Sequence, residues 1–202
     1  MNVDMDFDYP PADPLAVCKS WLDEAETLGL INPLACSLAT IDPEGRPSSR
    51  TVLLKALDEQ GAVFYTNRLS RKGKALQTNP WASMLFYWDM LARQILIEGR
   101  VSEVSDEESD AYFATRPRGS QIGAWASRQS EPVADRAALN KAVAEIEQRF
   151  EGREVTRPPH WGGYRLSLDR IEFWQGLLDR LHDRIEYVAT DHGTWDIQRL
   201  NP

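Results

Sequence analysis

The densest group of side chains able to do chemistry lies near the C-terminus, in the run Arg180-Leu181-His182-Asp183-Arg184. Successive side chains of a β-strand point to opposite faces, so a strand here would place Arg180, His182 and Arg184 on one face. Two guanidinium groups beside an imidazole repel one another unless an anion lies among them. The run therefore indicates an anion site, and a solvated sheet face is the alternative interpretation.

A second candidate is Ser70-Arg71-Lys72. Serine is a favoured N-cap, and the first turn of a helix offers free backbone N–H groups and a dipole that favours an anion. Two cations at this position predict a phosphate site. Basic residues at helix starts are also common on solvated faces, so the motif is weak by itself.

Two further sets of residues suit an anion. Arg50 and Lys55 stand at the two ends of an expected strand, where alternation puts them on opposite faces unless the strand twists. Tyr112, Arg116 and Ser120 are four residues apart and would share a helix face, although Pro117 interrupts that helix. Edge charges and an exposed helix end are the alternatives.

The elements that must position these residues follow from the hydrophobic pattern. Apolar residues at three- and four-residue steps predict a helix over Leu15–Leu28, and caps or composition predict helices over 70–78, 105–115 and 137–150. Strands are expected at 34–41, 51–57, 62–66, 82–88, 94–104, 163–168, 172–175, 184–189 and 194–199, with turns at 42–45 and 58–61. Short strands joined in this way predict a mainly β protein with flanking helices, built on an antiparallel barrel. Residues 1–14 are expected to form a flexible arm and residues 15–202 one domain.

Composition narrows the class of protein. The chain has 202 residues and a net charge of −8, from 23 Lys and Arg against 31 Asp and Glu, which argues against binding to nucleic acid. Cys18 and Cys36 form no CxxC pair, so we expect reduced thiols and no metal site. The acidic start of the chain and the lack of a long apolar run predict a cytoplasmic protein that does not enter the membrane. No dinucleotide, P-loop, GxSxG or zinc motif is present.

The C-terminal residues also identify a family. Glu172-Phe173-Trp174 followed by Arg180-Leu181-His182-Asp183-Arg184 resembles the C-terminal signature of pyridoxamine 5′-phosphate oxidases. The resemblance covers about residues 11–202. Its other blocks stand in the family's order: Arg50-x-x-Leu53-Leu54-Lys55, Phe64-Tyr65-Thr66-Asn67, Ser70-Arg71-Lys72, Arg93-Gln94, Arg116-Pro117-Arg118-x-Ser120-Gln121-Ile122-Gly123-Ala124-Trp125, Gln129-Ser130 and Trp161-Gly162-Gly163.

The resemblance implies an FMN-binding split β-barrel, present as a homodimer with FMN held between the subunits. It implies these FMN-binding residues: Arg50, Tyr65, Thr66, Arg71, Lys72, Gln94, Gln129, Ser130, Trp174 and Arg184. It implies that the substrate phosphate is held by Lys55, Tyr112, Arg116 and Ser120, and that Arg180 and His182 are the substrate-ring residues nearest the chemistry. The implied reaction is oxidation of pyridoxamine or pyridoxine 5′-phosphate to pyridoxal 5′-phosphate, with O2 as acceptor and hydrogen peroxide released.

Two features depart from the family's pattern, and both lie on the substrate side. Asp179 stands before Arg180, where the family has Gly, Asn or another small residue, and Leu177-Leu178 replaces a polar or small pair. The N-terminal arm is short and acidic. Two alternatives stay open: a related FMN oxidase of the phenazine-biosynthesis type acting on another ring, and a split-barrel protein that binds flavin or haem without catalysis.

Overall fold

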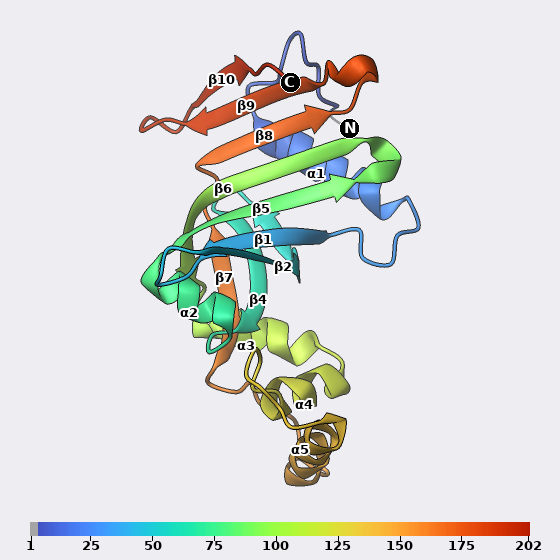
Figure 1. Ribbon diagram of the computed structural model, residues 1–202, viewed down its shortest axis with the longest axis vertical. Helices are drawn as coiled ribbons and strands as arrows, with labels where there is room; N and C mark the ends of the chain where they lie inside the picture. Colours follow the sequence, from blue (N-terminus) through green and yellow to red (C-terminus); the bar gives the residue numbers. More distant parts are fainter. Residues whose placement is uncertain (1–3) are drawn as a thin grey trace.

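The computed structural model describes residues 4–202, which form an antiparallel β-structure with flanking helices (Figure 1). The strands are β1 (Ala35–Ile41), β2 (Pro47–Leu53), β3 (Ala56–Asp58), β4 (Gly61–Asn67), β5 (Trp81–Trp88), β6 (Arg93–Glu103), β7 (Trp161–Leu166), β8 (Arg170–Gln175), β9 (Asp183–Ala189) and β10 (Trp195–Arg199). The helices are α1 (Pro14–Glu26), α2 (Arg71–Thr78), α3 (Asp106–Thr115), α4 (Arg118–Ala126) and α5 (Arg136–Arg149), with 3-10 turns η1 (Asp89–Leu91) and η2 (Leu178–Arg180). The mainly β class with flanking helices is confirmed.

Strand β6 joins the two parts of the curled sheet. Most of its length pairs with β5 and β8, and its last residues, Val101–Glu103, pair with β7. The order along the main path is β10-β9-β8-β6-β5-β1-β2, while β4 lies between β7 and β3. The two predicted turns are present, and their final glycines, Gly45 and Gly61, have positive φ angles of 78° and 140°. That conformation favours glycine.

Helix α1 closes one side of the sheet. Asp13 accepts a hydrogen bond from the Leu15 N–H at 2.9 Å and caps the helix, and Pro14 occupies its first turn. The apolar face expected from the sequence is buried, and the Trp21 ring packs edge-on against Phe173 at 5.3 Å. This packing fixes β8, which carries residues of the C-terminal signature.

The described part of the N-terminal arm lies against the domain. Met5 is buried in the main core, and the Tyr187 hydroxyl donates a hydrogen bond to the Pro11 carbonyl at 2.9 Å. The flexibility expected for residues 1–14 stays a prediction, and residues 1–3 lie outside the described residues.

One expected strand and one expected placement of residues on a strand are wrong. Residues 51–57 do not form one strand, because β2 ends at Leu53 and β3 begins at Ala56. At the break, Lys55 donates its backbone N–H to Val63 on β4 at 2.8 Å, so the chain changes partner strand. Arg180 and His182 also lie outside any strand, since Arg180 ends η2 and β9 begins at Asp183. Alternation along a strand therefore does not place Arg180, His182 and Arg184 on one face.

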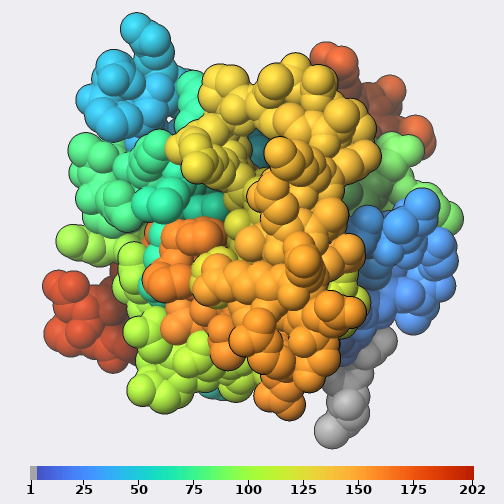
Figure 2. Space-filling view, turned by 90° about the horizontal axis from the view of Figure 1, so that it is seen from below, coloured from blue at the N-terminus to red at the C-terminus, as the bar shows by residue number. Residues whose placement is uncertain are grey.

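A smaller helical layer covers the lower end of the molecule. Pro117 separates α3 from α4, as its ring requires, and α4 itself was not expected from the sequence. A second core of Phe113, Ile122, Phe150, Val155 and Trp161 lies beneath the helices. Figure 2 shows the yellow and orange segment that includes α5 spread across this end. Within residues 4–202, no helix is both long and apolar enough to cross a membrane.

Candidate active site

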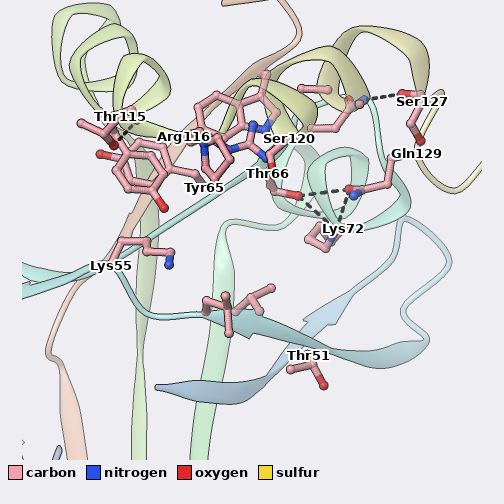
Figure 3. A pocket seen from close by; sticks show the side chains of 18 residues that line it. Thr51, Lys55, Tyr65, Thr66, Lys72, Thr115, Arg116, Ser120, Ser127 and Gln129 are labelled. Carbon is pink, nitrogen blue, oxygen red and sulfur yellow. Dashed lines mark hydrogen bonds between the residues drawn. The ribbon is translucent and has the colours of Figure 1, made fainter. Parts of the chain in front are cut away.

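A cavity of about 650 Å³ opens between β2, the end of β4, and helices α3 and α4 (Figure 3). It brings together residues from six of the sequence blocks described above. Eight of the predicted site residues line it: Lys55, Tyr65, Thr66, Lys72, Tyr112, Arg116, Ser120 and Gln129. Residues separated by up to 74 positions in the sequence, from Lys55 to Gln129, therefore face one space.

Lys72 forms the centre of one wall. Its Nζ donates to Gln129 Oε1 at 2.9 Å and to Thr66 Oγ1 at 3.1 Å, and Thr66 Oγ1 donates to the same Gln129 oxygen at 3.1 Å (Figure 3). The Ser70 hydroxyl caps α2 by accepting the Gly73 N–H at 3.3 Å. The expected helix start is thus present, and Lys72 points from its first turn into the cavity.

Lys72, Arg50 and Arg71 form a cluster of positive charges in which Arg50 repels both of the others. Burial and the charge of Arg50 lower the pKa of Lys72 from 10.5 to about 8. Burial and the charge of Arg71 also lower the pKa of Arg50. Among residues 4–202, Arg50 donates only to neutral oxygens, including the Leu38 carbonyl and Thr40 Oγ1, both at 2.9 Å. Such a cluster is relieved by an anion of more than one charge.

The predicted phosphate holders of the substrate occupy the opposite wall. Although Pro117 breaks the helix, Tyr112 from α3 and Ser120 from α4 both line the cavity, with Arg116 between the helices. Arg116 is half-buried, which lowers its pKa, and its buried Nη1 has no hydrogen-bond partner among the described residues. Lys55 reaches the same space from the β2–β3 break, with Nζ 5.9 Å from the Tyr112 ring.

Ser130 and Arg71 lie just outside this cavity. Both line a smaller neighbouring hollow of about 340 Å³, beside Gln129. Ser130 has a positive φ of 73°, a conformation that non-glycine residues rarely adopt. Arg71 is largely exposed and lies 3.7 Å from the Asp42 carboxylate.

Sequence reasoning gave no role to one prominent lining residue, Trp161. Its indole ring forms part of the cavity wall and contacts the Arg116 guanidinium at 4.6 Å. The signal available in the sequence was the pair of glycines that follows it. A Cβ on Gly163 would lie 2.7 Å from the Tyr65 ring, so glycine is required for the ring to approach the strand.

The remaining predicted residues form a second group on another part of the sheet. Gln94 on β6 is opposite Trp174 on β8, and Trp174 is opposite Arg184 on β9, so the three form a row across neighbouring strands. The His182 ring lies 4.6 Å from the Trp174 ring. Arg180 is exposed at the end of η2, two residues before His182.

Local hydrogen bonds fix parts of this second group. His182 Nδ1 accepts the Leu177 N–H at 3.0 Å, so the proton of the neutral imidazole lies on Nε2. Arg184 is paired with the Glu172 carboxylate at 2.8 Å, which raises the pKa of Arg184. In Figure 1, β8 and β9 lie at the upper end of the molecule, away from α3 and α4 at the lower end. One chain therefore carries two groups of predicted site residues that it does not itself bring together.

Comparison with known proteins connects the two groups. A family model described as pyridoxamine 5′-phosphate oxidase matches residues 22–150, which include the cavity except for Trp161. A second, described as the pyridoxine 5′-phosphate oxidase C-terminal dimerisation region, matches residues 161–202, which include Trp174, Arg180, His182 and Arg184. The chain belongs to the pyridoxamine 5′-phosphate oxidase family. As a member of this oxidase family, it is an enzyme, and the match to a dimerisation region supports the expected homodimer.

Two named members of the family are similar along nearly the whole chain. The pyridoxine/pyridoxamine 5′-phosphate oxidase of Rubrobacter xylanophilus is 56% identical over 190 residues, covering 94% of this chain and 87% of that protein. The enzyme of the same name from Cupriavidus necator is 53% identical, covering 94% and 89%.

Solved structures agree on the fold. The crystal structure of PhzG from Burkholderia lata 383, in complex with tetrahydrophenazine-1-carboxylic acid, has a TM-score of 0.90 at 36% identity and covers both chains fully. A pyridoxamine 5′-phosphate oxidase-related, FMN-binding protein from Nostoc punctiforme has a TM-score of 0.75 at 18% identity, covering 96% of this chain and 100% of its own. The split-barrel fold expected from the resemblance is thus confirmed.

Proposed function

We propose that this enzyme oxidises pyridoxamine 5′-phosphate and pyridoxine 5′-phosphate to pyridoxal 5′-phosphate, with FMN as cofactor and O2 as acceptor. The observation that carries the proposal is the arrangement of two cationic walls around one cavity, Lys72 on one side and Lys55 with Arg116 on the other. Two separate phosphates, one from the cofactor and one from the substrate, would satisfy both walls. The names of the relatives at 53–56% identity support the same substrates.

The donor set around Lys72 fits the phosphate of FMN. Arg50, Arg71 and Lys72 supply positive charge, and burial together with charge repulsion lowers the pKa of Arg50 and of Lys72. A phosphate dianion there would relieve the repulsion and accept charge-assisted hydrogen bonds. When bound, FMN would supply the redox chemistry, a two-electron oxidation at the C4′ carbon with O2 as final acceptor and hydrogen peroxide as product. With the alcohol substrate this gives the aldehyde directly, and with the amine substrate water is also consumed and ammonia released.

The substrate phosphate would be bound by Lys55, Tyr112, Arg116 and Ser120. Arg116 supports this role because its Nη1 is buried and has no hydrogen-bond partner among the described residues. A buried cationic donor without an acceptor is costly, and a phosphate oxygen would satisfy it. Binding at this remote group orients the substrate and positions C4′ for reaction.

We further propose that the second group of residues completes the site from the partner subunit of a homodimer. Gln94, Trp174 and Arg184 would contact the cofactor across the interface, and Arg180 and His182 would contact the substrate ring. The same face of the sheet leaves Trp81 and Tyr87 about half exposed, at 51% and 54%, as suits a surface that is covered in a dimer. His182 would present its Nε2–H to the substrate, because Nδ1 accepts the Leu177 N–H.

The enzyme is proposed to work in the cytoplasm. Cys18 and Cys36 are both buried free thiols, and burial raises the pKa of each well above its ordinary value. Reduced, unreactive cysteines are usual in that compartment.

The test is to purify the protein with FMN, add pyridoxamine 5′-phosphate in air, and follow pyridoxal 5′-phosphate and hydrogen peroxide together. The proposal expects a yellow protein and equal amounts of the two products. A protein that takes up no FMN, or an FMN-loaded protein that forms neither product, would contradict it. Because PhzG is similar over its full length, a reduced phenazine carboxylate is tested in parallel, and faster turnover of that compound would favour the alternative ring.

A further inference from the structure

Three aromatic rings form a layered cluster at the substrate wall of the cavity. The rings of Tyr65 and Tyr112 lie 4.1 Å apart at 16°, and Tyr65 and Trp161 lie 5.4 Å apart at 10°. Trp161 and Tyr112 are also nearly parallel, at 6.2 Å and 6°. All three residues line the cavity, next to the proposed substrate phosphate.

The two cations proposed to bind that phosphate lie on this cluster. The Arg116 guanidinium is 4.6 Å from the Trp161 ring and 5.6 Å from the Phe113 ring, and Lys55 Nζ is 5.9 Å from the Tyr112 ring. Distances within about 6 Å are those of cation–π contacts.

No carboxylate within the described residues forms an ion pair with Arg116 or Lys55. Other arginines in the same half of the molecule are paired: Arg165 with Asp58 at 2.6 Å and Arg157 with Asp110 at 2.6 Å. A carboxylate fixes a guanidinium but occupies its N–H donors and neutralises its charge, whereas a ring face fixes its plane and leaves both free. The free Nη1 of Arg116 agrees with the second arrangement.

We infer that Trp161 is a positioning residue for substrate phosphate specificity: its indole face holds the Arg116 guanidinium in place while leaving its N–H donors to the phosphate. The inference rests on the proposed function and adds to it a residue with no contact to the reacting atoms.

The backbone holds Trp161 firmly enough for this role. Trp161 begins β7, its N–H donates to the Pro158 carbonyl at 3.0 Å, and its carbonyl accepts from Arg157 Nη1 at 2.7 Å. Arg157 is in turn held by Asp106 and Asp110. The indole is buried, with 6% of the residue exposed.

The experiment compares Trp161→Leu and Trp161→Phe with the wild-type holoenzyme. Trp161→Leu should raise KM for pyridoxamine 5′-phosphate about tenfold with kcat within about twofold, because only phosphate binding is weakened. The inhibition constant of inorganic phosphate should rise by the same factor, and turnover of unphosphorylated pyridoxamine should stay as it was. Trp161→Phe keeps a weaker π-face and should show a smaller rise in both constants.

The matched control is Trp125→Leu. Trp125 makes the same kind of contact, with the Arg149 guanidinium 4.4 Å from its ring, but it does not line the cavity. This variant should keep KM and the phosphate inhibition constant of the wild type. Thermal unfolding and FMN content are measured for every variant.

Unchanged KM and unchanged phosphate inhibition in a folded, FMN-loaded Trp161→Leu enzyme would overturn the inference while leaving the proposed function intact. If that variant does not fold, identical constants for Trp161→Phe and the wild type overturn it instead. Equal weakening by Trp125→Leu would show a general packing effect and would also overturn it. Failure of the wild-type enzyme to oxidise pyridoxamine 5′-phosphate is a separate result, which contradicts the proposed function.

Discussion

At the scale of single residues, the buried amine of Lys72 makes FMN affinity depend on pH. Its pKa is about 8 in the protein alone, and a bound phosphate would raise it. Between the second pKa of the FMN phosphate, about 6, and about pH 8 the amine is charged with or without FMN, so affinity is flat. Above that pH, binding must draw a proton onto Lys72, so Kd should rise by up to about tenfold per pH unit. Fluorescence titration of FMN measures this, and Lys72→Gln should weaken binding and remove this rise.

The cations on the substrate wall should control KM. Lys55→Ala and Arg116→Ala each delete a charge-assisted bond to the substrate phosphate, worth roughly 1.5–3 kcal/mol, so KM should rise about tenfold to a hundredfold. Lys141→Ala removes an exposed lysine on α5, 77% exposed and 3.9 Å from Glu145, and serves as the control. Equal KM values for all three variants and the wild type would show that Lys55 and Arg116 bind something else.

Asp179 differs from the family's small residue, and its backbone explains the preference. Its φ of 56° and ψ of 18° lie in the left-handed region, which Gly, Asn and Asp tolerate best. We therefore expect the backbone conformation, rather than the charge, to matter. Asp179→Asn should change kcat/KM by less than about twofold. Asp179→Val should lower both activity and the unfolding temperature, because a β-branched residue fits this conformation poorly.

A gain of tenfold or more in Asp179→Asn would contradict this expectation. It would mean that the carboxylate weakens Arg180, and that the enzyme is tuned away from the vitamin substrate. Steady-state kinetics with pyridoxamine 5′-phosphate and circular dichroism melting of the two variants decide the matter.

At the scale of elements, α2 must lie close to the loop before it for Lys72 to enter the cavity. A Cβ on Gly73 would lie 2.1 Å from the Arg68 carbonyl oxygen, whereas Gly119 in α4 has nothing within 4 Å. Glycine to alanine in an open helix position stabilises by up to about 1 kcal/mol. Gly119→Ala should therefore raise the unfolding temperature, while Gly73→Ala should lower it and weaken FMN binding. Equal effects of the two substitutions would show that α2 is free to move.

The sequence predicted most elements because their local signals agreed. Asp13, Ser70 and Ser105 cap the three helices expected after them, and the glycines at 45 and 61 end the two predicted turns. Local signals could not show that β2 ends and β3 begins around Leu54-Lys55. That break depends on hydrogen bonds from the Leu54 and Lys55 backbone N–H groups to the carbonyls of Leu34 and Val63, which are distant in sequence.

The placement of Arg180 and His182 on a strand with Arg184 was wrong for a related reason. The alternation of charged residues suggested a strand. However, Asp179 and Arg180 both have positive φ angles, and the strand β9 does not begin until Asp183. A turn with positive φ angles is usually recognised in a sequence by a glycine, and here Asp179 occupies that position. Trp161 was missed because a tryptophan in sequence cannot be assigned to core or cavity until its neighbours are placed.

At the scale of the whole molecule, a net charge of −8 is compatible with the proposed anion sites, because Lys55, Lys72 and Arg116 line one cavity. The fold of one chain collects the first group of predicted residues there and leaves the second group on β6, β8 and β9. The spacing of these residues along the sequence does not reveal that separation. It follows from topology, and it makes the proposed oxidase dependent on two subunits.

Subunit complementation tests this central claim most directly. Arg116→Ala changes the cavity group and His182→Ala changes the C-terminal group, so each homodimer should turn over pyridoxamine 5′-phosphate poorly. A heterodimer of the two would contain one site with both substitutions and one with neither. Purified by two different tags and loaded with FMN, it should recover about half of the wild-type turnover, as two-fold symmetry requires. A heterodimer no more active than either parent would contradict an active site shared between the chains.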